Sequence, residues 1–126
     1  MDSIIDIIDV MIDFDAKPRK PIRLLKASEQ NMFARKLFAN IYEEISAIIG
    51  LDEEGWLVMC RAFSSRHGEA ALMHPYPDET RHVIHVANHP EGWHAPSALD
   101  KRNGAIIKDM MRAACDYDII ILHKDC

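Results

Sequence analysis

Histidines crowd into the middle of the chain, and imidazole has the widest chemistry of any side chain here. Six of the seven histidines fall between positions 67 and 94: His67, His74, His82, His85, His89 and His94. Neutral imidazole binds metal ions, and it ordinarily titrates near neutral pH. A cluster of this kind could therefore hold a metal, move protons or respond to pH, and it is the first candidate for a functional site.

The best-spaced metal ligands in this cluster are His85, His89 and His94, at intervals of four and five residues. The end of a strand followed by a loop can fold such residues around one ion, and Zn²⁺ with a completing Asp, Glu or Cys fits them best. No HExxH motif and no Cys-x-x-Cys pair fixes that geometry. Scattered, hydrogen-bonded histidines are the favoured alternative, so we expect no metal and no other cofactor.

Length and composition favour one soluble domain over residues 1–126. The chain has 126 residues, of which 48% are hydrophobic, and its apolar residues form short groups rather than one membrane-spanning run. Its first ten residues carry aspartates where a secretory signal would carry lysine or arginine. The cysteines Cys60, Cys115 and Cys126 have no disulfide-framework spacing. We expect a cytoplasmic protein that does not bind membranes.

Charge argues against a nucleic-acid partner. With 15 Lys and Arg against 20 Asp and Glu, the net charge of −5 would repel a phosphate backbone. The basic residues concentrate in residues 16–27, which also contain Pro18 and Pro21 and are expected to form a solvated connector within the domain. A protein partner with a basic surface suits this chain better.

Hydrophobic periodicity predicts two helices in the first half of the chain. In residues 2–15, Asp6, Asp9 and Asp13 share one side and isoleucines fill the other, as in an amphipathic helix. A second helix is predicted over residues 29–49. Its apolar residues recur at about one helical turn up to Gly50, in the series Phe33, Leu37, Ile41, Ile45 and Ile48.

The second half of the chain is predicted to supply the sheet. Three runs of strand formers cover Trp56–Phe63, Ala70–His74 and Arg81–Ala87, and a loop over residues 88–96 follows. Ser97 and Asp100 then resemble a capping box, which starts a helix that extends to about residue 116. The last run, Asp118–His123, is apolar enough for a strand buried on both faces and internal to the sheet.

These elements predict an α+β two-layer sandwich of order α-α-β-β-β-α-β. Its sheet would be an antiparallel three-strand meander plus a fourth strand after a helical crossover. The element order resembles the core of restriction-endonuclease-type nucleases, which implies Mg²⁺ held by an Asp and a Glu-x-Lys triplet. Here Glu69 precedes the second predicted strand, but Ala71 stands where the lysine would be. His85, Asn88 and His89 also resemble an HNH-type nuclease, although their placement departs from that pattern.

The function that the sequence favours is protein binding rather than catalysis, as in an inhibitor, antidote or adaptor. The expected contact residues are Asp6, Asp9 and Asp13 on the first helix and Trp93 and His94 in the loop, because tryptophan is favoured at binding hot spots. Two alternatives stay open. One is a metal-dependent hydrolase or nuclease that uses His85, His89 and His94, and the other is a sensor with a small ligand between sheet and helices. The sequence does not specify the oligomeric state.

Overall fold

A computed structural model describes residues 20–39, 41–64, 68–90, 95–111 and 114–123. It confirms the α+β class, with helices packed on one mixed four-stranded sheet. The elements in chain order are α2 (Ala27–Leu37), β1 (Ile45–Leu51), β2 (Leu57–Ser64), α3 (Glu69–Met73), β3 (His82–His89), α4 (Ala98–Met110) and β4 (Asp116–His123).

The strands lie side by side in the order β2-β1-β3-β4. Strand β1 is antiparallel to both β2 and β3, and β4 runs parallel to β3 after the crossover through α4. Three antiparallel strands and a fourth strand after a helical crossover are therefore present, as predicted. Within the antiparallel set β1 lies in the middle, so β3 pairs with β1 and not with β2.

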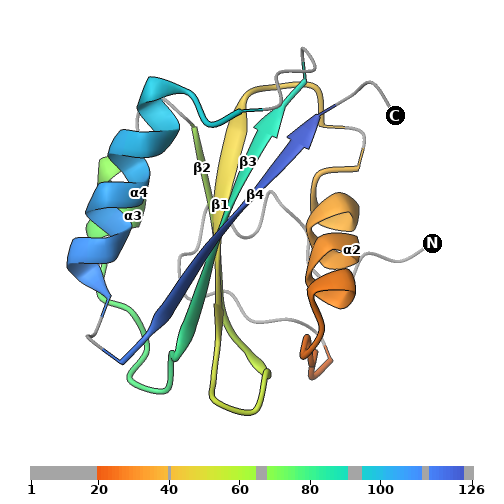
Figure 1. Cartoon of the computed structure of the whole chain (residues 1–126), viewed down its shortest axis with the longest axis vertical. Helices are drawn as coiled ribbons and strands as arrows, with labels where there is room; N and C mark the ends of the chain where they lie inside the picture. Colours follow the sequence, from red (N-terminus) through yellow and green to blue (C-terminus); the bar gives the residue numbers. More distant parts are fainter. Residues whose placement is uncertain (1–19, 40, 65–67, 91–94, 112–113, 124–126) are drawn as a thin grey trace.

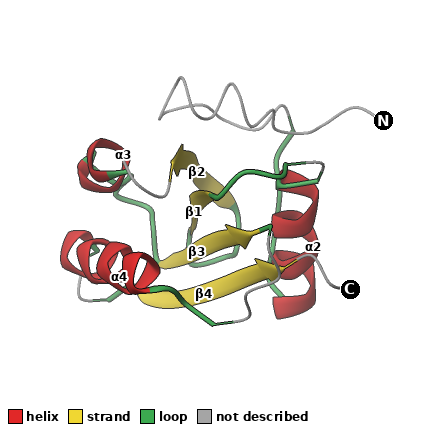
Figure 2. Cartoon of the chain, turned by 90° about the horizontal axis from the view of Figure 1, so that it is seen from above, coloured by secondary structure: helices red, strands yellow, loops and turns green. Residues whose placement is uncertain are grey.

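Helices cover both faces of the sheet, so the fold has three layers where the sequence suggests two (Figure 1, Figure 2). Helix α2 packs on one face, where Leu37 and Phe38 join a core with Ile49 and other alternate strand residues. Helices α3 and α4 pack on the opposite face, where Leu72 and Ile107 lie in a second core. The sheet thus separates two apolar cores.

The predicted helix over 29–49 is wrong beyond residue 37. Helix α2 ends at Leu37, and Ile45–Leu51 forms the central strand, all seven residues of which are buried. A strand covered on both faces has apolar side chains at every position, so its spacing also satisfies a helical pattern. The β-branched Ile45, Ile48 and Ile49, followed by Gly50, favour the strand that forms.

The segment predicted as a strand over Ala70–His74 is helical instead. Helix α3 covers Glu69–Met73, whose sequence EAALM consists of strong helix formers. Its Leu72 is fully buried against the sheet. The high helix propensity of these residues therefore determines the structure of this short segment, although its apolar run suggested a strand.

Strand β4 is not internal to the sheet, contrary to the prediction for Asp118–His123. It begins at Asp116 and lies at one edge, next to β3 only. Its side chains are accordingly exposed or half-buried except Leu122. Four consecutive apolar residues, Ile119–Leu122, therefore occupy an edge position.

The basic connector is described from residue 20 onward, and there it packs on the hairpin of β1 and β2. Arg23 forms a single antiparallel bridge with Trp56, and its guanidinium carbon lies 5.5 Å from the centre of the Trp56 ring. Leu24 next to it is buried. The basic side chains of Lys20, Arg23 and Lys26 are exposed, while Leu24 anchors this segment to the core.

Among the described residues, no helix combines the length and apolar character needed to cross a membrane.

A buried arginine fastens α3 and the chain after it to the sheet. Arg61 on β2 is 1% exposed, and its guanidinium donates hydrogen bonds to the carbonyl oxygens of Ala71, His74 and Pro75. The same guanidinium lies 5.0 Å from the ring centre of Tyr76. The planar guanidinium carries several N–H donors, so this one side chain can bond to several carbonyl oxygens that would otherwise lack partners.

Replacing Arg61→Met tests this contact. Loss of the guanidinium leaves buried carbonyls without donors, and each costs about 1 to 3 kcal/mol, so we expect the free energy of unfolding to fall by about 3 kcal/mol or more. Denaturant unfolding followed by circular dichroism measures it. Arg81→Met is the matched control, since Arg81 also bonds carbonyls, of Asp78 and Thr80, but at a more open site. Equal losses in the two variants would contradict the role of Arg61.

Candidate functional site

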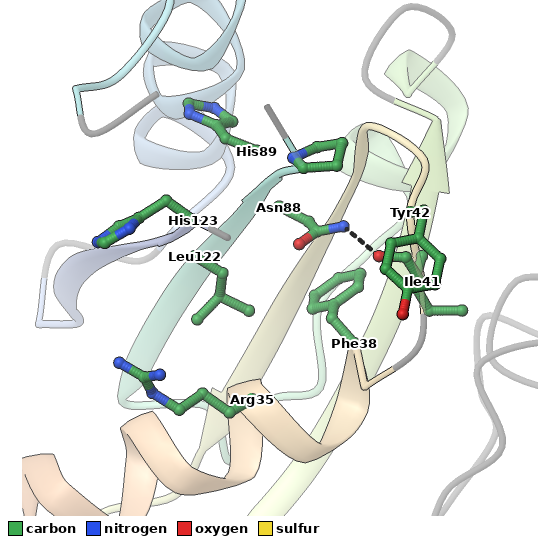
Figure 3. Close-up of a pocket in the computed structure, with 9 residues that line it drawn as sticks. Arg35, Phe38, Ile41, Tyr42, Asn88, His89, Leu122 and His123 are labelled. Carbon is green, nitrogen blue, oxygen red and sulfur yellow. Dashed lines mark hydrogen bonds between the residues drawn. The ribbon is translucent and has the colours of Figure 1, made fainter. Parts of the chain in front are cut away.

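The described residues line an open pocket of about 240 Å³ where the carboxyl ends of β3 and β4 meet the end of α2 (Figure 3). Parallel neighbours such as β3 and β4 bring their carboxyl ends to the same edge of the sheet, which is where α/β sheets commonly bind ligands. The pocket is lined by Arg35, Phe38, Ile41, Tyr42, Asn88, His89, Pro90, Leu122 and His123.

The floor of the pocket is apolar and belongs to the core under α2. Phe38 and Leu122 are buried members of that core, and Ile41 packs against it. Phe38 caps the end of α2 through its backbone N–H, and its carbonyl accepts from the N–H of Ile41. The turn after the helix therefore holds Phe38 and Ile41 in place.

Asn88 fixes the wall between β3 and the chain that enters β1. Its Nδ2 donates to the carbonyl oxygen of Ile41, at 3.2 Å (Figure 3). It also donates to the carbonyl oxygen of Glu43, at 2.9 Å. The side chain is nearly buried. A buried amide with both of its hydrogens bonded holds one orientation, so this wall is formed before any ligand arrives.

Three side chains that can carry positive charge come from three elements around the pocket. Arg35 comes from α2, His89 from β3 and His123 from β4 (Figure 3). The guanidinium of Arg35 is exposed and stays protonated at every physiological pH. None of the nine lining residues is an aspartate or glutamate, although acidic residues outnumber basic ones in the chain.

His89 is held by a buried carboxylate. Its Nε2 lies 2.7 Å from Oδ2 of Asp100, and the two side chains are 5% and 2% exposed. Asp100 also accepts from the backbone N–H of Ser97, while Ser97 Oγ accepts from the N–H of Asp100, so the predicted capping box is confirmed. The first turn of α4 thus orients the imidazole that lines the pocket.

A second buried histidine lies on the same face of β3, away from the pocket. His85 has no exposed surface, and its Nδ1 is 3.1 Å from the hydroxyl of Tyr117. Burial lowers the pKa of His85 from 6.5 to about 4, against the opposing effect of the Asp100 carboxylate. Burial, together with Asp100 and Asp118, raises the pKa of Tyr117 to about 12, which keeps its hydroxyl able to donate to His85. His85 is therefore neutral near pH 7.

The packing of α4 on this pair depends on a glycine. Gly104 is buried on α4, and a Cβ atom there would lie 2.7 Å from the Tyr117 hydroxyl oxygen. Asp100, Asn103 and Ile107 share this buried face of the helix. Close approach of the helix backbone is what covers the hydroxyl of Tyr117 and the imidazole of His85.

The structure brings two of the three proposed zinc ligands to one face but gives them different partners. His85 contacts Tyr117 and His89 contacts Asp100. His94 lies outside the described residues. In the described part of the chain, no three His, Cys, Asp or Glu side chains gather as a metal would require. The zinc site remains an untested alternative.

The residues proposed to bind a partner all fall outside the described part of the chain. These are Asp6, Asp9 and Asp13 in the first segment and Trp93 and His94 in the loop before α4. Their role stays a prediction.

Sequence reasoning missed most of the pocket. Arg35, Asn88 and His123 come from three elements, and no spacing along the chain marks them as neighbours. The capping-box signal did identify Asp100, but not its contact with His89.

Comparison with known proteins gives no match: no family model, no curated protein and no solved structure is similar to this chain. The features of the described residues that bear on function are therefore the pocket and the paired side chains of His89 and Asp100 behind it.

The His85 environment predicts a specific dependence of stability on pH. Between pH 6.5 and about 4 the unfolded chain binds a proton at His85 that the native state excludes, so stability falls as pH drops through this window. At about 1.4 kcal/mol per pH unit, the loss due to His85 is roughly 3 kcal/mol. Denaturant unfolding at a series of pH values measures it.

The variant His85→Gln should unfold with a flatter pH profile than the wild type over the same range, because glutamine does not titrate. His74→Gln, at a half-buried histidine outside this contact, is the control and should keep the wild-type slope. An unchanged slope in His85→Gln would show that other groups cause the pH dependence.

The two roles of Asp100 can be separated by mutation. Ser97→Ala removes only the helix cap and should cost about 1 kcal/mol of unfolding free energy. Asp100→Ala removes the cap contact and also leaves buried His89 without its carboxylate, so we expect a loss of about 3 kcal/mol. Equal losses, measured by thermal and denaturant unfolding, would show that the contact with His89 contributes nothing.

Proposed function

We propose that the protein is a binding protein whose pocket holds a small anionic molecule with an apolar portion. This makes the small-ligand alternative from the sequence the one that the geometry supports best. The observation that carries the proposal is the joining of Arg35, His89 and His123 around an apolar floor at the carboxyl ends of β3 and β4.

Electrostatics supports an anion. Arg35 offers a planar fork of donors, the geometry that matches a carboxylate or phosphate. His123 adds an imidazole at another wall, and no described lining residue is an aspartate or glutamate. His89 is bonded through Nε2 to the buried carboxylate of Asp100 and serves as part of the wall. In an acidic chain, a pocket lined in this way attracts anions locally while the rest of the surface repels them.

The floor and the volume limit the rest of the ligand. Phe38, Ile41 and Leu122 present apolar surface, and Tyr42 beside them is exposed. A pocket of about 240 Å³ is smaller than the roughly 300 to 1,000 Å³ typical of pockets for drug-sized ligands. A single ring or a short branched chain bearing one carboxylate or phosphate group suits this space.

Binding of simple probes tests the proposal. We expect benzoate and phenyl phosphate to shift the amide NMR signals of residues around the pocket, and neutral benzamide to bind at least about tenfold more weakly. The variant Arg35→Gln should weaken binding of both anions by about tenfold or more, since a hydrogen bond to a charged group contributes about 1.5 to 3 kcal/mol.

Lys36→Gln is the matched control. It removes the same charge one residue further along α2, outside the pocket lining, and should leave the affinity almost unchanged. Equal binding of benzoate and benzamide, or equal effects of the two variants, would refute anion recognition by Arg35.

Protein binding, the function favoured by the sequence, is the second candidate. The proposed contacts Asp6, Asp9, Asp13, Trp93 and His94, with an inhibitor, antidote or adaptor role toward a basic partner, remain part of that proposal. One specific observation among the described residues favours a protein partner, and it is the open edge of the sheet along β4.

A further inference from the structure

Three buried polar side chains on the face of the sheet that α3 and α4 cover have atoms without a hydrogen-bond partner among the described residues. These atoms are Oγ of Ser46, Nε2 of His85 and Nδ2 of Asn103. The three residues are 1%, 0% and 4% exposed, respectively. Buried polar groups in folded proteins almost always have a partner, so three such atoms on one face indicate that they share one.

The register of the strands places Ser46 beside His85. Ile48 of β1 pairs with His85 of β3. Ser46 lies two residues before Ile48 and pairs with Ala87. Side chains two residues apart on a strand point to the same face, so Ser46 and His85 are diagonal neighbours across the two strands. Ile48 belongs to the core under α3 and α4, which identifies the face they share.

Helix α4 brings Asn103 over the same part of the sheet. Asn103 shares the buried face of the helix with Asp100 and Gly104. A Cβ atom at Gly104 would lie 2.7 Å from the hydroxyl oxygen of Tyr117, and that hydroxyl bonds to Nδ1 of His85. Asn103, the residue before Gly104, therefore lies above the pair formed by His85 and Tyr117.

Small side chains leave room between this part of the sheet and α4. Ser46 is paired with Ala87, which is 1% exposed but belongs to neither of the two apolar cores. Two small side chains side by side leave space for a molecule the size of water, which needs about 10 to 15 Å³. The near-complete burial of both residues is compatible only with a space of that size.

The hydrogen-bonding roles of the three atoms indicate what occupies this space. Tyr117 donates to Nδ1 of the neutral His85 ring, so the ring hydrogen is on Nε2 and this atom is a donor. Nδ2 of Asn103 is a donor as well, and Oγ of Ser46 can donate or accept. Burial lowers the pKa of His85 and the carboxylate of Asp100 opposes this effect, so Asp100 is close enough to repel an anion from the same place. Water, which both accepts and donates, fits all three atoms.

We propose that one ordered water molecule is bound between α4 and the sheet by Ser46, His85 and Asn103. It accepts hydrogen bonds from Nε2–H of His85 and Nδ2–H of Asn103, and it donates one to Oγ of Ser46. Three hydrogen bonds are about the usual number for a buried water. The water joins β1, β3 and α4, and the proposal is independent of the pocket ligand.

A high-resolution crystal structure of the full chain, together with NMR of its imidazoles, tests the site. We expect one peak of density within about 2.7 to 3.2 Å of all three atoms. The Hε2 hydrogen of His85 should give a rotating-frame Overhauser cross-peak with water, whose sign distinguishes a long-lived contact from hydrogen exchange. Crystals soaked in bromide should show no anomalous peak there. A structure without density beside Nε2 of His85, or with bromide bound there, overturns the proposal.

The variant Asn103→Leu removes one donor and places an apolar side chain of similar size in its position. We expect both the density peak and the cross-peak between His85 and water to be lost. Thr80→Val is the matched control, because Thr80 also has a buried hydroxyl without a described partner but lies beside Gly50, further along β1 than Ser46. The control should keep the cross-peak, and equal effects of the two variants would contradict the site.

A second variant decides the matter if Asn103→Leu does not fold, as judged by circular dichroism. Ser46→Val approaches the site from the sheet, because its branched side chain enters the space beside Ala87 and cannot accept a hydrogen bond. The same loss of the cross-peak is expected. A cross-peak between His85 and water that persists in Ser46→Val overturns the proposal.

Discussion

Complete burial of the central strand β1 is the constraint on which the rest of the fold depends. All seven of its residues are buried, and it bonds to β2 on one side and β3 on the other. Ile48 and Ile49 face opposite ways, so each face of the sheet needs its own cover. Helix α2 supplies that cover on one face and α3 with α4 on the other, and the crossover through α4 then sets β4 parallel to β3.

The two faces of the sheet differ in polarity, and the buried histidines and Asp100 lie on the face that α4 covers. The α2 side is a nearly continuous apolar core, whereas His85, His89 and Asp100 are buried under α4. Buried polar groups cost free energy unless they are hydrogen-bonded. His89 and Asp100 satisfy each other, while Nε2 of His85 and Nδ2 of Asn103 have no partner among the described residues. The α4 layer is therefore more sensitive to protonation than the α2 layer.

The sequence alone could predict elements that depend on local signals, such as helix caps. It could not predict features that depend on which strands pair with each other. The capping box at Ser97 located α4, and the α+β class with its helical crossover followed from the element order. The apolar series through Ile41 and Ile45 suggested one long helix because burial on both faces gives no strand periodicity. The unbroken apolar run Ile119–Leu122 suggested an internal strand, although β4 lies at the edge of the sheet. The pocket was not predictable, since Arg35, His89 and His123 become neighbours only when the sheet forms.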